Sequence, residues 1–232
     1  MNSVQLNCST TLNSVQYKRA RSLFRAKPEA INMARRSDHS REELREMALS
    51  AAERIVVEQG YEGLSARKVA AAIGYTVGTL YLVFENIDDL ILHVNARTLD
   101  RLHARMADLQ ASSADSRDYL ERLGEVYIRF ADEDPHRWAM VFEHRLAEDR
   151  TVPAWYQDKI ARMFAMVEGG LAPLARQRPP EDITEAARAL WGGVHGICIL
   201  ALSDTLGVAG VDSVQKLTRS LISNYLKGFT SE

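Results

Sequence analysis

The sequence has little cysteine and no long apolar run. Only two cysteines occur among its 232 residues, Cys8 and Cys198, and they stand far apart in the chain. A disulfide framework is therefore not expected, and a reducing cytoplasm is the expected location. The longest apolar stretch, from Trp191 to Leu202, is shorter than the roughly 18 residues that suggest a membrane span, and it contains His195. Neither a signal sequence nor a membrane partner is expected.

The sequence also lacks the motifs of catalysis, phosphate loops and metal centres. Gly169-Gly170 is not followed by Lys-Ser/Thr, and no serine stands in a nucleophile-elbow context. His195 and Cys198 are spaced to share a helix face, but a zinc site needs a third or fourth ligand, and His136 or His144 would have to converge on them. We therefore predict no enzyme, no catalytic residue, no cofactor and no metal.

From Leu64 to Leu90 the chain predicts two short helices joined by a glycine turn and followed by a third helix. Ser65 is suited to cap the first helix, and Gly74 to supply the left-handed residue that ends it. Thr76 is suited to cap the second helix and Asn86 the third, whose first turn carries two aspartates. This is the layout of a helix-turn-helix, which reads DNA when the exposed first turn of its second helix enters a major groove.

The second helix is expected to expose its start and to bury Leu80, Tyr81 and Phe84. Three residues cluster at that exposed start: Val77, Gly78 and Thr79. A structural corner without DNA binding is the alternative, because aromatic residues at helical spacing usually pack in a core. The joint presence of caps, turn and Thr-Leu-Tyr favours DNA reading.

This segment resembles the helix-turn-helix of the TetR family of bacterial transcriptional regulators. The motif of that family has a glycine, a polar cap, Thr-Leu-Tyr, an aromatic residue and a Lys-acid-x-Leu run. Most of it is present here: Gly74, Thr76, Thr79-Leu80-Tyr81, Phe84 and Asp89-Leu90. By position, the resemblance implies that Arg67 and Thr79 approach base edges and that Val77 and Gly78 line the groove. It also implies that Thr76 and Tyr81 hold phosphates.

One position departs from the family motif, and the net charge of the chain is −2. Ile87 stands where the family usually carries a phosphate-binding lysine, so one backbone contact is expected to be missing. Residues 40–86 carry five basic and seven acidic side chains, so they are slightly acidic. We therefore expect Arg67, Lys68 and backbone amides at helix starts to supply the attraction to phosphates.

Residues 1–39 form a basic extension, with seven basic and two acidic side chains. One interpretation is an arm that lies along the minor groove or the phosphates, as homeodomain arms do. The other, which we favour, is a disordered tail or a mis-assigned translation start for residues 1–32, since no clear periodicity precedes Met33. The segment MARRSDHSREELREMAL also looks like the start of a family member.

From Ser40 onward the periodicity predicts an all-α fold of nine helices. Residues 40–92 are expected to form a three-helix helix-turn-helix domain that binds DNA, and residues 93–232 a helical domain for effector binding and dimerisation. Ser40 and Glu43 form a candidate capping box at the first helix. Four further starts are predicted from proline or capping patterns. These lie at Pro135, Pro153, Asp182 with Glu185, and Asp212 with Gln215.

The last two predicted helices are the expected association surface. Small residues from Ala186 to Ala201 allow close approach of backbones, and apolar residues such as Leu200, Leu217 and Tyr225 supply contact area. Packing within one subunit is the alternative. Dimerisation is favoured because two recognition helices related by a two-fold axis read a palindromic operator with twice the contacts.

The C-terminal part is similar to a TetR subtype named for its Trp-His-Gly signature, on the segments 134–142 and 191–196. Candidate contacts to a small apolar or amphipathic effector are Trp138, Phe142, Met163, Trp191 and His195. For each of them core packing is the alternative. His195 is the strongest candidate, because an imidazole on an apolar helix needs a polar partner, which a buried hydrogen bond would equally supply.

These observations predict a cytoplasmic, homodimeric repressor that an effector releases from operator double-stranded DNA. The alternative is a small-molecule-binding or interaction protein that keeps the helix-turn-helix as a structural unit and has lost operator binding. Ile87 and the acidic residues 40–86 motivate that alternative.

Overall fold

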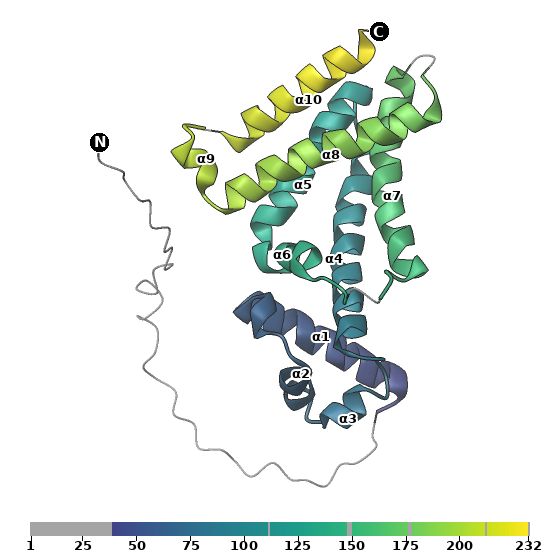
Figure 1. Cartoon of the computed structure of the whole chain (residues 1–232), viewed down its shortest axis with the longest axis vertical. Coiled ribbons are helices and arrows are strands. Elements are labelled where there is room, and N and C mark those ends of the chain that lie inside the picture. Colours follow the sequence, from purple (N-terminus) through teal and green to yellow (C-terminus); the bar gives the residue numbers. More distant parts are fainter. Residues whose placement is uncertain (1–38, 111, 148–149, 176–177, 212, 232) are drawn as a thin grey trace, which may run out of the picture. The chain divides into compact units, whose positions relative to one another are not determined.

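The computed structural model describes residues 39–110, 112–147, 150–175, 178–211 and 213–231, which form helices, short turns and loops (Figure 1). Within these ranges there is no strand, as an all-α fold requires. The predicted basic extension and Cys8 lie outside the described residues, apart from His39. In the described part of the chain, no helix is long and apolar enough to cross a membrane.

Three helices precede the long central helix. Helix α1, Arg41–Gln59, begins with the predicted capping box between Ser40 and Glu43, and Gly60 ends it. A short 3-10 turn, Tyr61–Gly63, leads to α2, Ala66–Ala72, and then to α3, Val77–Leu80. We call α1 to α3 the head. Its core contains alanines and aliphatic residues of α1 together with Leu80 and Phe84.

Helix α4, Ile87–Gln110, is continuous from the head into the C-terminal helices. Asn86 caps its start as predicted, because its Oδ1 accepts a hydrogen bond of 3.0 Å from the amide of Asp89. Leu90, Ile91 and Val94 of α4 belong to the head core, whereas Leu102 and Met106 belong to the core of the C-terminal helices. The boundary predicted at residue 92 therefore falls inside this helix.

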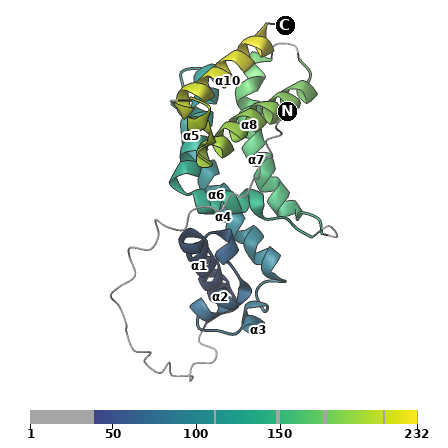
Figure 2. The same ribbon diagram turned by 60° about the vertical axis from the view of Figure 1, so that its left-hand side comes forward.

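The remaining helices follow α4 in the chain, and the first three of them pack against it (Figures 1 and 2). They are α5, Ser116–Glu133; α6, Pro135–Glu143; α7, Ala154–Leu171, followed by the 3-10 turn Ala172–Leu174; α8, Pro180–Leu202; α9, Thr205–Val208; and α10, Val214–Thr230. Helices α8 and α10 lie side by side, and both contact α5.

Two glycines allow these helices to approach closely. A Cβ built on Gly124 of α5 would lie 2.7 Å from Cδ1 of Ile222 on α10. A Cβ on Gly170 of α7 would lie 2.8 Å from Cδ2 of Leu120 on α5. Real Cβ atoms do not come that close, so the side chains opposite these two positions fill the space that a larger residue would need.

Several predicted helix boundaries were wrong. Helix α8 begins at Pro180, without a side-chain cap from Asp182, because proline itself favours the first helical position. Ser213 caps α10 by accepting from the amide of Lys216, and Asp212 lies outside the described residues. Helix α7 follows the start predicted at Pro153 and runs through two glycines to Leu171, and the short α9 was not predicted.

Candidate functional site

The head presents the start of α3 to solvent. Thr76 caps this helix by accepting a hydrogen bond of 3.2 Å from the amide of Thr79, and the two threonine hydroxyls lie 3.0 Å apart. Thr76 and Gly78 are exposed, and Val77 and Thr79 are half-buried. The first turn of α3 is therefore free to meet a partner, with unpaired backbone N–H groups at its start.

Of the three residues predicted to face inward at and after α3, one was misplaced. Leu80 is fully buried and Phe84 is 3% exposed, whereas Tyr81 is 42% exposed. The reason is that α3 is a single turn whose buried side is already supplied by Leu80, and the next residue lies about 100° further round the helix. The exposed phenol of Tyr81 is available for contacts outside the chain.

Two arginines of α1 hold the segment after α3, and sequence reasoning missed both. Arg41 donates to the carbonyl of Leu82, and Arg45 donates to the carbonyl of Val83 over 2.8 Å. The guanidinium of Arg45 also lies 4.6 Å from the ring centre of Phe84. These bonds give hydrogen-bond donors to two carbonyls of the turn that follows α3.

Two basic residues of α2, the helix that precedes α3, are exposed. Arg67 is exposed, and Lys68 is exposed with its ammonium 2.7 Å from Oε1 of Gln59. Ile87, in the position of the family lysine, packs partly buried against the head core. At the turn before α3, the hydroxyl of Tyr75 lies 2.8 Å from Nδ1 of His39, a pairing that the sequence pattern did not suggest.

The C-terminal helices enclose an apolar pocket of about 300 Å³. All thirteen residues that line it are aliphatic, aromatic or methionine, contributed by α4, α5, α6, α7 and α8. Trp138 is fully buried in its wall, and Ile160 is partly exposed at 37%. A pocket of this size and lining suits an apolar ligand or the apolar part of a larger one.

The polar groups of this lining are the hydroxyls of two tyrosines and the indole N–H groups of two tryptophans. The hydroxyl of Tyr127 lies 2.8 Å from Nδ1 of His195, and it accepts a hydrogen bond of 3.1 Å from Nε1 of Trp191. Burial raises the pKa of Tyr127 and lowers the pKa of His195, so both groups are uncharged at neutral pH. Burial also raises the pKa of Tyr156 to about 12. The lining is thus electrically neutral.

The structure brings together four of the five predicted effector residues. Trp138, Phe142, Met163 and Trp191 line the apolar pocket. His195 does not line the pocket but contacts two residues that do, Tyr127 and Trp191. Its ring is stacked on that of Trp191, with 5.1 Å between the ring centroids. In the described part of the chain, no group of three or more histidine, cysteine or acidic residues is arranged to hold a metal ion.

Comparison with protein families gives two matches. The family of bacterial regulatory proteins named tetR matches residues 48–94, and the tetracyclin repressor-like C-terminal domain matches residues 120–225, together more than half of the chain. The chain belongs to the TetR family. The Trp-His-Gly subtype stays a prediction, because the description of the matching C-terminal domain does not distinguish it.

Individual relatives of this TetR-family protein are distant. The transcriptional activator FasR of Mycolicibacterium smegmatis is 27% identical over 121 residues, which are 52% of this chain and 54% of FasR. The match thus spans about half the length of that curated relative.

Two solved structures illustrate the shared fold. A protein of unknown function from Rhodococcus sp. RHA1 has a TM-score of 0.66 and 20% identity, over 80% of this chain and 94% of that one. The regulator FadR of Bacillus subtilis, in complex with stearoyl-CoA, has a TM-score of 0.54 and 18% identity, over 80% of this chain and 97% of that one. At these identities the structural similarity establishes a common fold and nothing more.

Proposed function

We propose that this TetR-family protein is a homodimeric, cytoplasmic transcriptional repressor that binds a palindromic operator through its head and is released by a small apolar or amphipathic effector. The observation that carries the proposal is the exposed, capped first turn of α3 in the head. Arg67 and Thr79 are assigned to base edges, and Val77 and Gly78 to the wall of the groove. Lys68, Thr76 and Tyr81 are assigned to phosphates.

The effector is assigned to the apolar pocket, with Trp138, Phe142, Met163 and Trp191 in contact with it. The neutral, apolar lining favours a hydrocarbon chain or ring over a charged molecule, because an unpaired charge is costly to bury. An acyl chain fits this chemistry, and the Bacillus subtilis neighbour is in complex with stearoyl-CoA. His195 would act through its contact with the Tyr127 hydroxyl.

The dimer is assigned to the outer faces of α8 and α10. Gly192 and Gly196 of α8 are exposed, and a Cβ at either position would have open space around it. Ile199 and Leu200 on the same helix are 44% and 43% exposed. Other members of the predicted association surface, such as Ala186, are buried within the subunit and would not reach a partner. A smooth, partly apolar helix face of this kind allows two helices to pack closely.

Contacts between the head and the C-terminal helices offer a route from effector to DNA. Glu53 of α1 lies 3.4 Å from Arg97, 3.1 Å from Arg101 and 3.5 Å from Arg137. On another side of the head, the hydroxyl of Tyr61 lies 2.9 Å from Nδ1 of His144. A shift of α4 or α6 around a bound effector would therefore change their contacts with α1. A ligand that binds one arrangement of these helices more tightly would shift the head toward the corresponding orientation.

The test is fluorescence anisotropy with labelled DNA flanking the protein's own gene, at one fixed salt concentration. Arg67→Ala is expected to weaken operator binding by about 1–3 kcal/mol and to relax base preference, as loss of a base contact does. Tyr81→Phe is expected to weaken operator and unrelated DNA alike, about fivefold, through loss of a phosphate hydrogen bond. Arg129→Ala, an exposed change on α5, is the control.

Unchanged operator affinity in both head variants would contradict the DNA-binding assignment. The sign of regulation is measured separately with a reporter gene behind the same flanking DNA. Repression predicts that deletion of the regulator raises reporter output, whereas the FasR relative is named an activator.

A second candidate function is a small-molecule-binding or interaction protein without operator binding. The partly buried Ile87 favours it, because the first turn of α4 then offers one phosphate contact fewer than the family motif. Absence of any sequence-specific complex at low salt, where phosphate contacts are strongest, would select this function over the first.

A further inference from the structure

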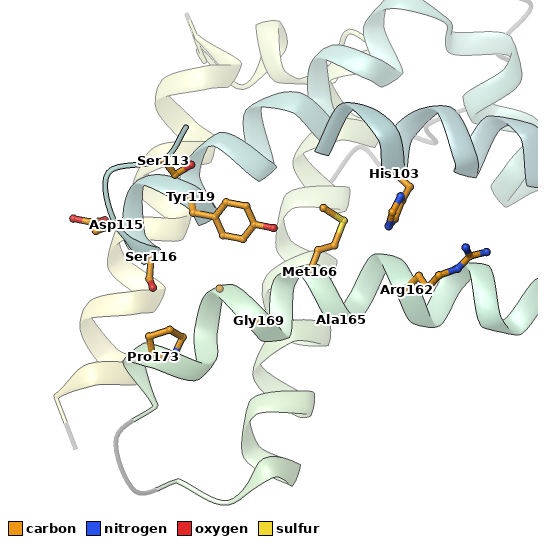
Figure 3. A pocket seen from close by; sticks show the side chains of 11 residues that line it. His103, Ser113, Asp115, Ser116, Tyr119, Arg162, Ala165, Met166, Gly169 and Pro173 are labelled. Carbon is orange, nitrogen blue, oxygen red and sulfur yellow. The ribbon is translucent and has the colours of Figure 1, made fainter. Parts of the chain in front are cut away.

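A second cavity, distinct from the apolar pocket, lies between α4, the start of α5 and α7 (Figure 3). It is an open groove of about 510 Å³. Met166 and Tyr119 point toward one another in its middle, and His103 and Arg162 face it from α4 and α7 at one end. Asp115 and Ser116 stand at the other end.

The basic end of the groove has unused hydrogen-bonding capacity. Among the contacts of the described residues, Arg162 makes a single one, from Nε to the carbonyl of Asp158 in its own helix at 3.4 Å. Its two terminal nitrogens thus remain available as a planar fork for an oxyanion. His103 makes no hydrogen bond or ion pair within the described residues and faces the same space.

Neighbouring cations on α4, α7 and α8 differ from Arg162, because carboxylates already hold them. Lys159 lies one turn earlier on α7 and 2.6 Å from Asp100. Arg105 of α4 pairs with Glu133. Arg188 of α8 pairs with Glu168 over 2.5 Å. The cation of α7 that faces the groove is therefore the one left for an external anion.

The other end of the groove disfavours an anion. The carboxylate of Asp115 accepts hydrogen bonds of 2.9 Å from the amides of Arg117 and Asp118, so it caps the start of α5. Its negative charge occupies the place that an anion would need at this helix start. The groove is thus polarised, with positive charge at the Arg162 end.

The groove and the apolar pocket lie on neighbouring faces of the same two helices, α4 and α7, because consecutive residues of a helix point about 100° apart. Arg162 precedes Met163 on α7, and His103 follows Leu102 on α4, and both apolar neighbours line the pocket. An amphipathic molecule whose tail fills this neutral pocket must place its charge outside it. Met106 lines the apolar pocket and Met166 lines the groove, and both side chains are flexible enough to move aside for a molecule that spans the two cavities.

We propose that the groove holds the oxyanion head group of an amphipathic effector, a carboxylate or a phosphate ester, through Arg162 and His103 while the tail occupies the apolar pocket. The proposal rests on the proposed function, because it takes the apolar pocket as the effector site. It deepens that function by requiring an anionic group on the effector.

The test is calorimetric titration of the full-length protein with decanoate, decyl phosphate and 1-decanol. A pocket of 300 Å³ holds about ten groups the size of a water molecule or a methylene, which sets the chain length. Decanoate or decyl phosphate is expected to bind about tenfold more tightly than decanol, as a charge-assisted hydrogen bond provides. The tighter of the two identifies the head group.

Two variants make the test specific. Arg162→Gln is expected to weaken both anions about tenfold and to leave decanol unchanged. Lys159→Gln removes the same charge one turn away on the same helix, from an ammonium that Asp100 already holds, and is expected to change none of the three. Methyl NMR of ¹³C-labelled methionine adds a readout of position, since the anions should shift Met166 and Met163, and decanol Met163 alone.

Equal affinity for decanol and both anions, or anion affinities that Arg162→Gln does not lower, would overturn the groove as a head-group site and leave the apolar pocket standing. No binding of any of the three would overturn the groove and the effector assignment together. The anisotropy measurement with DNA is independent of both results.

Discussion

The head and the C-terminal helices differ in how their side chains are packed. In the head, α1 contributes small residues such as Ala48 and Ala52, both fully buried, so that short helices pack closely against it. The C-terminal helices place large aromatic residues such as Trp138 and Tyr127 around cavities. A head proposed to hold α3 in one orientation gains from dense packing, whereas a part proposed to admit a ligand must leave space.

The largest expected effect is a cavity in the head. Leu80→Ala removes a fully buried side chain and is expected to lower the free energy of unfolding by about 3 kcal/mol, from lost apolar burial and the cavity left behind. Urea denaturation measures it. Leu82→Ala, only two residues away but 64% exposed, is the control and should change stability by less than about 0.5 kcal/mol. Similar losses in both variants would mean that the head is not densely packed.

A larger side chain at the pocket of the C-terminal helices should change the free energy of unfolding very little. Val141→Phe adds volume where the pocket has room, so the free energy of unfolding is expected to change by less than about 1 kcal/mol. Decanol binding is expected to fall more than tenfold, because the added ring occupies ligand space. Calorimetry measures it, and retained decanol affinity would show that Val141 does not border the occupied part of the pocket.

The helix starts of the head are expected to contribute less. Ser65→Ala removes the oxygen that accepts from the amide of Lys68, at a cost of about 1 kcal/mol in unfolding free energy. Ser65→Asp should restore most of that loss, since an aspartate is an equally good cap. Ser50→Ala, in the exposed middle of α1, is the control and is expected to be nearly neutral. No difference between Ser65 and Ser50 would argue against a stabilising cap.

The smallest expected effect is acid sensitivity of the C-terminal helices. Burial lowers the pKa of His195 below its ordinary value of 6.5, so the unfolded chain takes up a proton before the folded protein does. The stability associated with neutral His195 is therefore present above pH 6.5 and is lost as the pH falls below it. Thermal melting between pH 7.5 and 5.5 should show a smaller decrease for His195→Gln than for the native sequence, while equal decreases would exclude His195 as a contributor.

Local signals in the sequence predicted the head well. Ser40, Ser65, Thr76 and Asn86 each cap the helix predicted for them, because a cap acts through residues within one turn. The family motif selected Thr76 to Tyr81, and the structure exposes the start of that helix. Tyr81 was wrong as an inward residue because the length of α3 was not predicted, and a one-turn helix buries only one narrow side.

The C-terminal helices were less predictable because their features depend on contacts between distant segments. Trp138, Phe142, Met163 and Trp191 were chosen by composition, but only folding places residues of three helices around one pocket. The groove between His103 and Arg162 joins positions 59 residues apart and carries no motif. The hydroxyl partner of His195 likewise comes from Tyr127 on another helix.

The continuity of α4 has a mechanical consequence. From Leu99, in the wall of the pocket, to Ile87, which packs against the core of the head, twelve residues of unbroken helix extend about 18 Å. A stiff rod of that length turns a tilt of about 5° at the pocket into a displacement of about 1.5 Å at the first turn of the helix. A ligand that tilts α4 at Leu99 by this small angle would therefore move Ile87 by about the length of a covalent bond.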